Sequence, residues 1–244
     1  MTDDNAINRY PNRPLPWDPK IGEAAGEMEF FIRYLVMSLL SNLQAKAQKY
    51  TSDPDLVSQA KSYLFLMNNT YYLSEQLSFN YALESSAPIL RNKEEDVEGN
   101  DYKISGQWFS DQVNKLFEHS KKKYLQYWEV LNHHLTKVKD SELSYSNAEQ
   151  KLLTLDSGRL LKTRFSGFNE EFEKTYALHK ELTIIDPKLR EKLLEEVKSV
   201  FLPKYTEFYN KYSKYQFSKK NMEDYLKYPP SKVETMMADM FCSY

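Results

Sequence analysis

The residue types that most often carry out enzyme chemistry are sparse and poorly spaced in this chain. His133 and His134 are adjacent, so on a helix their side chains point about 100° apart and cannot share a metal ion as an i, i+4 pair can. Glu129 lies one helical turn before His133, which is an ordinary contact along a helix face. The single cysteine, Cys242, has no histidine near it in sequence to activate its thiol. These patterns predict structural histidines, no metal site and no cysteine nucleophile.

The segment Arg-Phe-Ser-Gly-Phe at 164–168 comes closest to a nucleophile motif. It lacks the first glycine of Gly-x-Ser-x-Gly, and it lies in a helical pattern rather than at a strand-to-helix turn. The chain has only 6 glycines, too few to suggest a glycine-rich phosphate loop. Paired carboxylates are not found either, so an enzyme is the least favoured interpretation and no cofactor is expected.

Lysines near the C-terminal end are the residues best suited to a binding function. Residues 198–232 contain eight lysines against Glu207, Glu223 and Asp224, a local balance of +5, although the whole chain carries −2. The near-neutral total argues against a dedicated nucleic-acid binder. Clustered lysines attract anionic lipid headgroups at about 1 kcal/mol each, so this region predicts a peripheral contact with an anionic membrane.

Aromatic residues alternate with these lysines in KYTEFYNKYSKYQF. Such interleaving would suit a nucleic-acid surface on which bases stack. Tyr205, Phe208 and Tyr212, however, fall on one helical stripe with the lysines opposite. We therefore interpret these aromatics as core residues and expect no nucleic-acid partner.

The elements that position these residues are predicted to be helices. Apolar side chains recur every three or four positions, and no strand-like alternation of any length appears. Asp186 followed by Pro187 is a helix start, with the aspartate as cap and the proline in the first turn. Pro203 is expected to kink the helix that follows near Ser199. Long helices are predicted at about residues 27–50, 54–81, 107–136, 160–179 and 187–212.

Two Ser-x-x-Glu spacings predict helix starts by a capping box. The spacing at 146–149 would open a short helix over the leucines of residues 152–155, which Gly158 would end. The spacing at 231–234 would open a terminal helix.

Two segments fall outside the helical pattern. Four prolines lie within residues 11–19, so residues 1–26 are predicted to be an extended, proline-rich leader. Residues 88–106 include an acidic, glycine-containing stretch and are predicted to be a surface loop. The remaining chain, within residues 27–244, is predicted to form an all-α helical-bundle region.

Cysteine content and hydropathy bear on the compartment. A single cysteine excludes an intrachain disulfide and suits a reducing compartment. The N-terminus lacks the basic start and apolar stretch of a secretory signal. The longest uncharged window, residues 62–74, is shorter than the roughly 20 apolar residues that cross a bilayer. We expect a cytoplasmic protein whose membrane contact is peripheral.

Four sequence blocks carry the pattern of a known family. Three follow in order near the end: RLLKTRFSGFNEEFEKTY, DPKLREKLLEEVKSVFLPKYTEFYNKY and DYLKYPPSKVETMMADMF. The fourth lies upstream and contains Phe-Leu-Met-Asn-Asn at 65–69. Together they resemble the C-terminal region of the Exo70 subunit of the exocyst, the complex that tethers secretory vesicles to the plasma membrane. The resemblance covers roughly Met28 to the end.

The resemblance implies a fold and a function. The family fold is a rod of consecutive antiparallel helical bundles. Members act in exocytosis with other exocyst subunits and Rho-family GTPases, and bind phosphatidylinositol 4,5-bisphosphate at the inner face of the plasma membrane, at sites of secretion, through C-terminal basic residues. Because family members are considerably longer, the chain is expected to be a fragment or a shortened member.

The family's lipid motif, Lys-Tyr-x-Lys-Tyr before the last helix, corresponds here to DYLKY at 224–228. Lys227 matches the second lysine, whereas Asp224 replaces the first and would repel a phosphate. Nearby lysines would compensate. The alternative is a helical protein-interaction scaffold without lipid binding. The residues predicted to bind lipid are Lys219, Lys220, Lys227 and Lys232.

Overall fold

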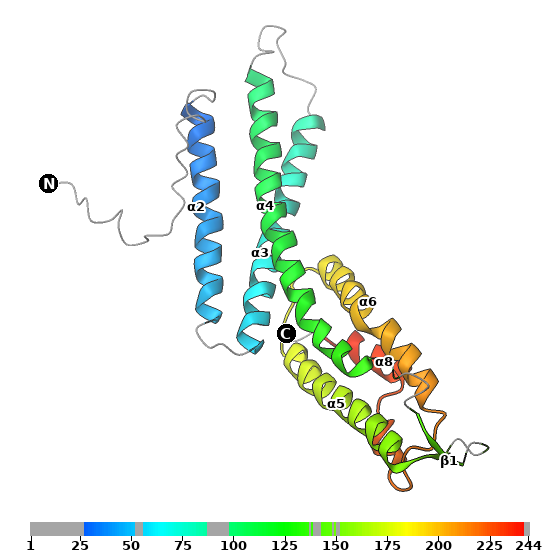
Figure 1. The fold of residues 1–244 in the computed structure, drawn as a ribbon. Coiled ribbons are helices and arrows are strands. Elements are labelled where there is room, and N and C mark those ends of the chain that lie inside the picture. The colour runs from blue at the N-terminus through cyan, green and yellow to red at the C-terminus, as the bar shows by residue number, and fades with distance from the viewer. Residues whose placement is uncertain are drawn as a thin grey trace, which may run out of the picture. The chain divides into compact units, whose positions relative to one another are not determined.

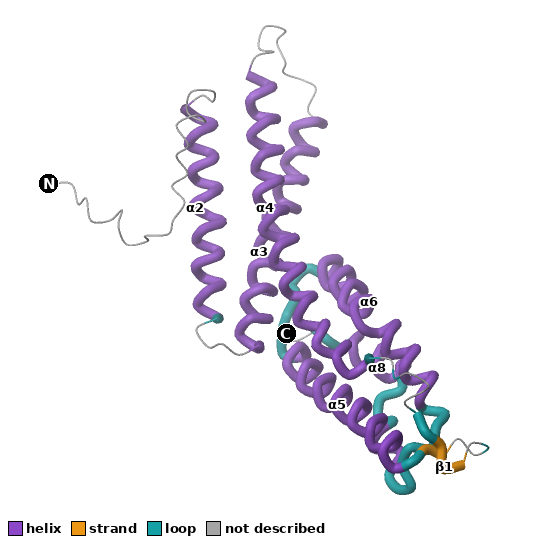
Figure 2. Tube along the Cα trace, viewed as in Figure 1, coloured by secondary structure: helices purple, strands orange, loops and turns teal. Residues whose placement is uncertain are grey.

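Secondary structure is almost entirely helical (Figure 1 and Figure 2), which confirms the predicted all-α class. The chain divides into two compact units, residues 1–120 and 121–244. The predicted leader and Cys242 lie outside the described residues. The computed structural model describes residues 27–51, 56–86, 98–136, 138, 143–147, 149 and 152–241.

The first unit is built from long helices. α2 (Glu27–Tyr50) and α3 (Leu56–Ser86) run antiparallel, and the first part of α4 (Glu98–Trp128) adds to the same core (Figure 1). The core residues of α2 recur at helical spacing, as expected for an amphipathic face buried in a bundle. The buried members of this cluster are Val36, Leu40, Leu43, Ala47, Leu66 and Val113.

α4 begins before its predicted start at residue 107. Residues 98–106 of the predicted loop are helical, while residues 87–97 lie outside the described residues. Extending an existing helix costs less than nucleating a new one, so the strong helix that follows overrides the loop-like composition. The C-terminal end of the predicted helix also differs, because α4 ends at Trp128 and a 3-10 helix, η2 (Glu129–Leu135), follows.

α5 (Leu155–Lys180) and α6 (Pro187–Tyr212) form the centre of the second unit and run antiparallel (Figure 1). The start of α6 is confirmed, because Oδ1 of Asp186 accepts hydrogen bonds at 2.8 and 3.0 Å from the amides two and three residues later. α6 stays helical through Pro203, and the kink expected there remains a prediction.

Aromatic side chains fill the space between α5 and α6. Phe168 stacks on Tyr205 with ring centroids 3.8 Å apart and an interplanar angle of 9°. Tyr205, Phe208 and Tyr212 are all buried, which confirms their assignment to the core. Because buried aromatic pairs contribute about 0.5–1.5 kcal/mol beyond the area they bury, this contact joins the two helices firmly.

The capping box predicted at 146–149 is wrong. Ser146 lies in β1 (Tyr145–Asn147), which pairs antiparallel with β2 (Leu152–Leu153). The serine Oγ donates to the carbonyl oxygens of Leu152 and Leu153 at 3.3 Å each. A serine hydroxyl can donate a hydrogen bond to a strand carbonyl as readily as it can accept one from a helix amide. The Ser-x-x-Glu spacing alone therefore does not distinguish a strand from the start of a helix.

Gly158 lies in the first turn of α5 and does not end a helix as predicted. A Cβ at this position would lie 2.8 Å from the carbonyl oxygen of Phe217. The glycine therefore allows the chain that follows α6 to approach α5 closely. Leu155, which was expected in that short helix, is instead the first residue of α5 and is 83% exposed.

The terminal helix predicted from 231–234 is present as α8 (Pro230–Ala238), but the capping box is wrong, because the N-cap lies two residues before Ser231. Pro229 occupies the N-cap with an extended backbone, and no side chain caps the helix. Proline suits the first helical position, since its fixed φ is already helical and its missing N–H is not needed there. Val233 and Met237 of this helix are buried.

His179, near the end of α5, is fully buried in an aromatic box. Its Nδ1 donates to the carbonyl oxygen of Thr175 at 2.7 Å, which places the proton of the neutral ring on Nδ1. Burial lowers the pKa of His179 to about 4, because the charged ring would lose its hydration. The surrounding rings belong to Tyr124, Tyr127, Trp128 and Phe241.

Acidification is expected to destabilise the second unit through His179. The folded-state pKa of about 4 lies below the ordinary value of 6.5. Between these two pH values the unfolded state binds more protons, so the free energy of unfolding falls as the pH falls. Urea unfolding should show a loss of about 2 kcal/mol from this residue between pH 7 and pH 5. His179→Phe should lose distinctly less over the same interval, and an equal loss would contradict the assignment.

Gly158→Ala is expected to destabilise the protein although alanine is the better helix former. The propensity gain is about 1 kcal/mol, but the new methyl group meets the Phe217 carbonyl, and overpacking costs about 1–3 kcal/mol. We expect a net loss of up to about 2 kcal/mol in urea unfolding. Ser166→Ala, at an exposed position of α5, is the matched control and should not lose stability. A stabilised Gly158→Ala variant would show that this close approach is absent.

Candidate functional site

The lysines predicted to bind lipid lie on the chain between α6 and α8 and at the start of α8. We call residues 218–232 the basic segment. It includes the short helix α7 (Met222–Tyr225) and enters α8 at its end. The side chains of all four predicted lysines are exposed, so their charges face the solvent.

An asparagine on α5 holds the middle of the basic segment. The Nδ2 of Asn169 donates to the carbonyl oxygens of Asp224 at 3.3 Å and Tyr225 at 3.0 Å. Asn221 precedes α7 in the left-handed conformation with φ of 55°, which asparagine tolerates better than most residues. Asn221 therefore allows the chain to turn before α7, and Asn169 fixes the segment to α5.

Two tyrosines of α6 hold the end of the basic segment. The buried hydroxyl of Tyr205 donates to the carbonyl oxygen of Tyr228, while the ring of Tyr205 stacks on Phe168. The hydroxyl of Tyr209 donates to the carbonyl oxygen of Leu226 at 3.4 Å. An irregular backbone offers its carbonyls few partners of its own, so these donors satisfy groups that would be costly to leave unpaired.

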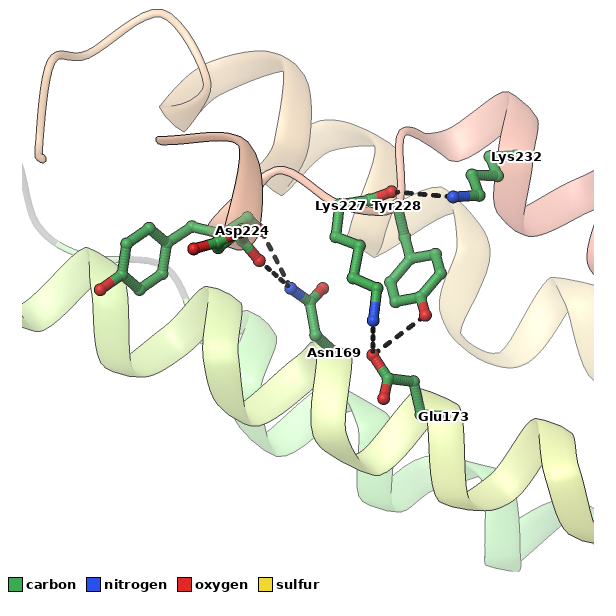
Figure 3. Close-up of polar contacts among 7 residues, drawn as sticks. Asn169, Glu173, Asp224, Lys227, Tyr228 and Lys232 are labelled. Carbon is green, nitrogen blue, oxygen red and sulfur yellow. Dashed lines mark hydrogen bonds and ion pairs between the residues drawn. The ribbon is translucent and has the colours of Figure 1, made fainter. Parts of the chain in front are cut away.

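Lys227 is engaged by an acidic partner on α5 (Figure 3). Its Nζ lies 2.8 Å from Oε1 of Glu173, and the same oxygen accepts a hydrogen bond from the hydroxyl of Tyr228 at 3.0 Å. The two side chains of the ion pair are 49% and 43% exposed, so the pair contributes about 1 kcal/mol or less. It nevertheless neutralises one of the four predicted lysines.

The pKa values of the pair follow from this contact. The hydrogen bond from Lys227 lowers the pKa of Glu173, although partial burial acts in the opposite direction. The same hydrogen bond raises the pKa of Lys227. Both groups therefore remain ionised at neutral pH.

Lys232 belongs to the same group as Lys227. Its Nζ lies 5.0 Å from the centroid of the Tyr228 ring, and the Nζ of Lys227 lies 5.2 Å from it. The Nζ of Lys232 also donates to the carbonyl oxygen of Lys227 at 3.4 Å (Figure 3). A cation near an aromatic face gains about 0.5–1 kcal/mol at an exposed site, so the buried ring of Tyr228 helps to position both lysines.

Lys219 and Lys220 form a second group at the start of the basic segment. With Lys162 of α5 they line a cavity of about 460 Å³ that Asp224 also borders. The Nζ of Lys162 lies 5.6 Å from the centroid of the Tyr225 ring. Neither Lys219 nor Lys220 forms an ion pair with any residue that the structure describes, so this group carries the less neutralised charge.

The α5 residues that hold the basic segment were missed by sequence reasoning. Their spacing places three polar residues on one face of α5: Lys162, Asn169 and Glu173. This polar stripe was the only sign in the sequence that this face of α5 contacts another polar segment. Its partners lie 54–56 residues away in sequence, and spacing within one helix says nothing about partners so distant.

The other candidate residues behave as structural groups. His133 is exposed and His134 is partly buried, with its ring against Gly167, so the glycine of segment 164–168 makes room for a histidine. No cluster of three potential metal ligands occurs among the described residues. Within the same residues, each helix is too short or too polar to span a bilayer.

An all-α core that presents exposed lysines on an irregular segment defines a class of helical proteins with a basic surface segment. Within this class, the chain belongs to the Exo70 family of exocyst subunits. The family model that describes the C-terminal part of the Exo70 exocyst complex subunit matches residues 16–239. The resemblance carried by the four sequence blocks is therefore confirmed.

Individual relatives agree with this assignment. Exocyst complex component EXO70A1 of Arabidopsis thaliana is 26% identical over 214 residues, which cover 85% of this chain and 29% of the relative. Exocyst complex component 7 of Drosophila melanogaster is 24% identical over 214 residues, covering 88% and 27%. The solved structure of Saccharomyces cerevisiae Exo70 shares the fold, with a TM-score of 0.50 and 22% identity over 86% of this chain and 35% of that one. The chain thus spans about a third or less of these proteins.

Tyr205→Phe is expected to lower the free energy of unfolding by about 1–2 kcal/mol. The variant keeps the ring on Phe168 but leaves the Tyr228 carbonyl without its donor, and an unsatisfied buried acceptor costs about that much. Tyr209→Phe removes a longer hydrogen bond from a less buried hydroxyl and should lose about 0.5 kcal/mol or less. Urea unfolding measures both variants. Equal losses would argue against a special role for Tyr205.

Proposed function

We propose that this chain is the membrane-facing part of an exocyst subunit that helps to tether secretory vesicles to the plasma membrane. It binds phosphatidylinositol 4,5-bisphosphate in the inner leaflet through Lys219, Lys220, Lys227 and Lys232. The observation that carries the proposal is that all four lysines are exposed on one segment whose backbone is tied to α5 and α6. Family membership supports the tethering role.

The proposed partners follow from the same role. Other exocyst subunits bind the helical surface, and a Rho-family GTPase is the regulatory partner. The protein acts without catalysis, in the cytoplasm and peripherally at the inner face of the plasma membrane at sites of secretion.

The lysines contribute unequally to the proposed binding. Lys219 and Lys220 provide the leading contact, because their ammonium groups have no acidic partner among the described residues. Lys227 must exchange Glu173, at 2.8 Å, for a phosphate. Asp224 borders the cavity of the first group and reduces its attraction for anions. These two acidic residues favour the second candidate function, a scaffold that binds proteins but not lipid.

Removing all four lysines is expected to abolish binding to anionic vesicles. At about 1 kcal/mol each, with Lys227 partly neutralised, the variant with four alanines should bind at least about 100-fold more weakly. Cosedimentation with phosphatidylcholine vesicles that contain phosphatidylinositol 4,5-bisphosphate measures this, and wild-type binding should weaken as salt is added.

A variant with the same loss of charge elsewhere serves as the control. The exposed lysines Lys46, Lys115, Lys122 and Lys123, changed to alanine, should leave vesicle binding nearly intact. Unchanged binding of the first variant would refute the lipid site. Absence of binding by the wild-type chain would favour the scaffold.

A further inference from the structure

Leu155, the first residue of α5, is the most exposed large apolar side chain among the described residues, with 83% of its surface accessible. Single exposed leucines are common on protein surfaces, so exposure alone carries no inference. Leu152 and Leu153 just before it are half-buried and buried. The chain thus turns two leucines inward and the third outward.

The backbone before Leu155 is fixed rather than loose. The amide of Leu153 donates to the carbonyl oxygen of Gln216 at 3.3 Å, and the amide of Thr154 donates to that of Ser144 at 2.9 Å. Hydrogen bonds to two different parts of the chain hold the strand that leads into α5. Leu155 therefore protrudes from a well-supported corner.

The surroundings of Leu155 are cationic. It lines the same cavity as Lys162, Lys219 and Lys220, at the end of α5 that lies beside β1 in Figure 1. A protruding apolar side chain among basic residues suits an anionic bilayer, because the lysines attract headgroups while the apolar group leaves water. Neither the exposed leucine nor the lysines alone would identify this end of the unit as the one that faces a membrane.

We infer that the β1 end of the second unit faces the bilayer, and that Leu155 inserts among the lipid headgroups while Lys219 and Lys220 bind the surrounding phosphates. The inference rests on the proposed lipid binding. It adds the orientation of the unit on the membrane and an apolar contact that the charge pattern does not reveal.

Acidic groups near this end reduce the attraction without removing it. Asp156 lies next to Leu155, and its carboxylate is 3.7 Å from the guanidinium of Arg159. Asp224 borders the cavity. Three lysines line that cavity with this one carboxylate, so its balance remains positive.

The opposite end of α5 provides an internal comparison. Ile185, in the turn after α5, is 80% exposed, but its charged neighbours in sequence are mixed: Glu181 and Asp186 against Lys180 and Lys188. At 1.5 Å per residue, the 26 residues of α5 separate the two ends by about 39 Å. When the axis of α5 is tilted out of the membrane plane, insertion of the Leu155 end therefore leaves the Ile185 end outside the headgroup layer.

Depth-dependent quenching tests the orientation. A polarity-sensitive dye is attached to Leu155→Cys or to Ile185→Cys, each in a Cys242→Ser background whose vesicle binding is first matched to wild type. Vesicles contain phosphatidylcholine, phosphatidylserine and phosphatidylinositol 4,5-bisphosphate, with bromine atoms high on the acyl chains. We expect the dye at 155 to brighten and to be quenched by bromine, and the dye at 185 to show neither change.

The possible results separate this inference from the proposed function. Binding without quenching at 155, or with equal quenching at both positions, overturns the inference and leaves lipid binding in place. Failure of the matched wild-type chain to bind overturns both.

Leu155→Ser supplies a measurement without a dye. We expect its vesicle affinity to fall about fivefold to tenfold, because part of the transfer free energy of a leucine is lost. Ile185→Ser should bind as wild type does. Circular dichroism should be unchanged for both, since neither side chain is packed in the core. An unchanged affinity for Leu155→Ser contradicts the inference.

Discussion

Tyr205 connects the aromatic core of the second unit to the surface that carries the lysines. Its ring stacks on Phe168 at 3.8 Å, and its hydroxyl donates to the carbonyl oxygen of Tyr228. The same side chain thus joins α5 to α6 and ties the basic segment to both. A phenylalanine would serve the first role and not the second, which explains why a polar aromatic occupies a fully buried position. The placement of Lys227 and Lys232 around the Tyr228 ring depends on this tie.

Charge at the candidate site is smaller than a count of lysines suggests. Glu173 takes up the charge of Lys227 at 2.8 Å, and Asp224 borders the cavity formed with Lys219 and Lys220. The proposed binding to an anionic surface would then depend on a few lysines whose backbone is already held in place, which lowers the entropy cost of ordering the segment. An apolar contact from Leu155 would add to this modest electrostatic attraction and would orient the second unit on the membrane.

Local patterns predicted the helices and their buried faces, because those depend on spacing within one element. The start of α6 at Asp186–Pro187 and the buried aromatic stripe of Tyr205 are examples. The hairpin at Ser146 and the exposure of Leu155 were not predictable, because both depend on strand pairing and on residues such as Gln216 far along the chain. The four lysines were identified from composition and family resemblance. The role of Glu173 in neutralising Lys227 could not be predicted, because it depends on how α5 packs beside the basic segment, 54 residues away in sequence.

The basic segment is held as a fixed part of the helical unit and is not a flexible tail. Amide ¹⁵N relaxation of residues 218–228 in the full chain, free of lipid, measures this directly. We predict order parameters near the value of about 0.85 that is typical of rigid backbone, close to those of α5 and α6. Values below about 0.6 across these residues would mean that the hydrogen bonds from Asn169 and Tyr205 do not hold the segment and that it moves as a flexible tail.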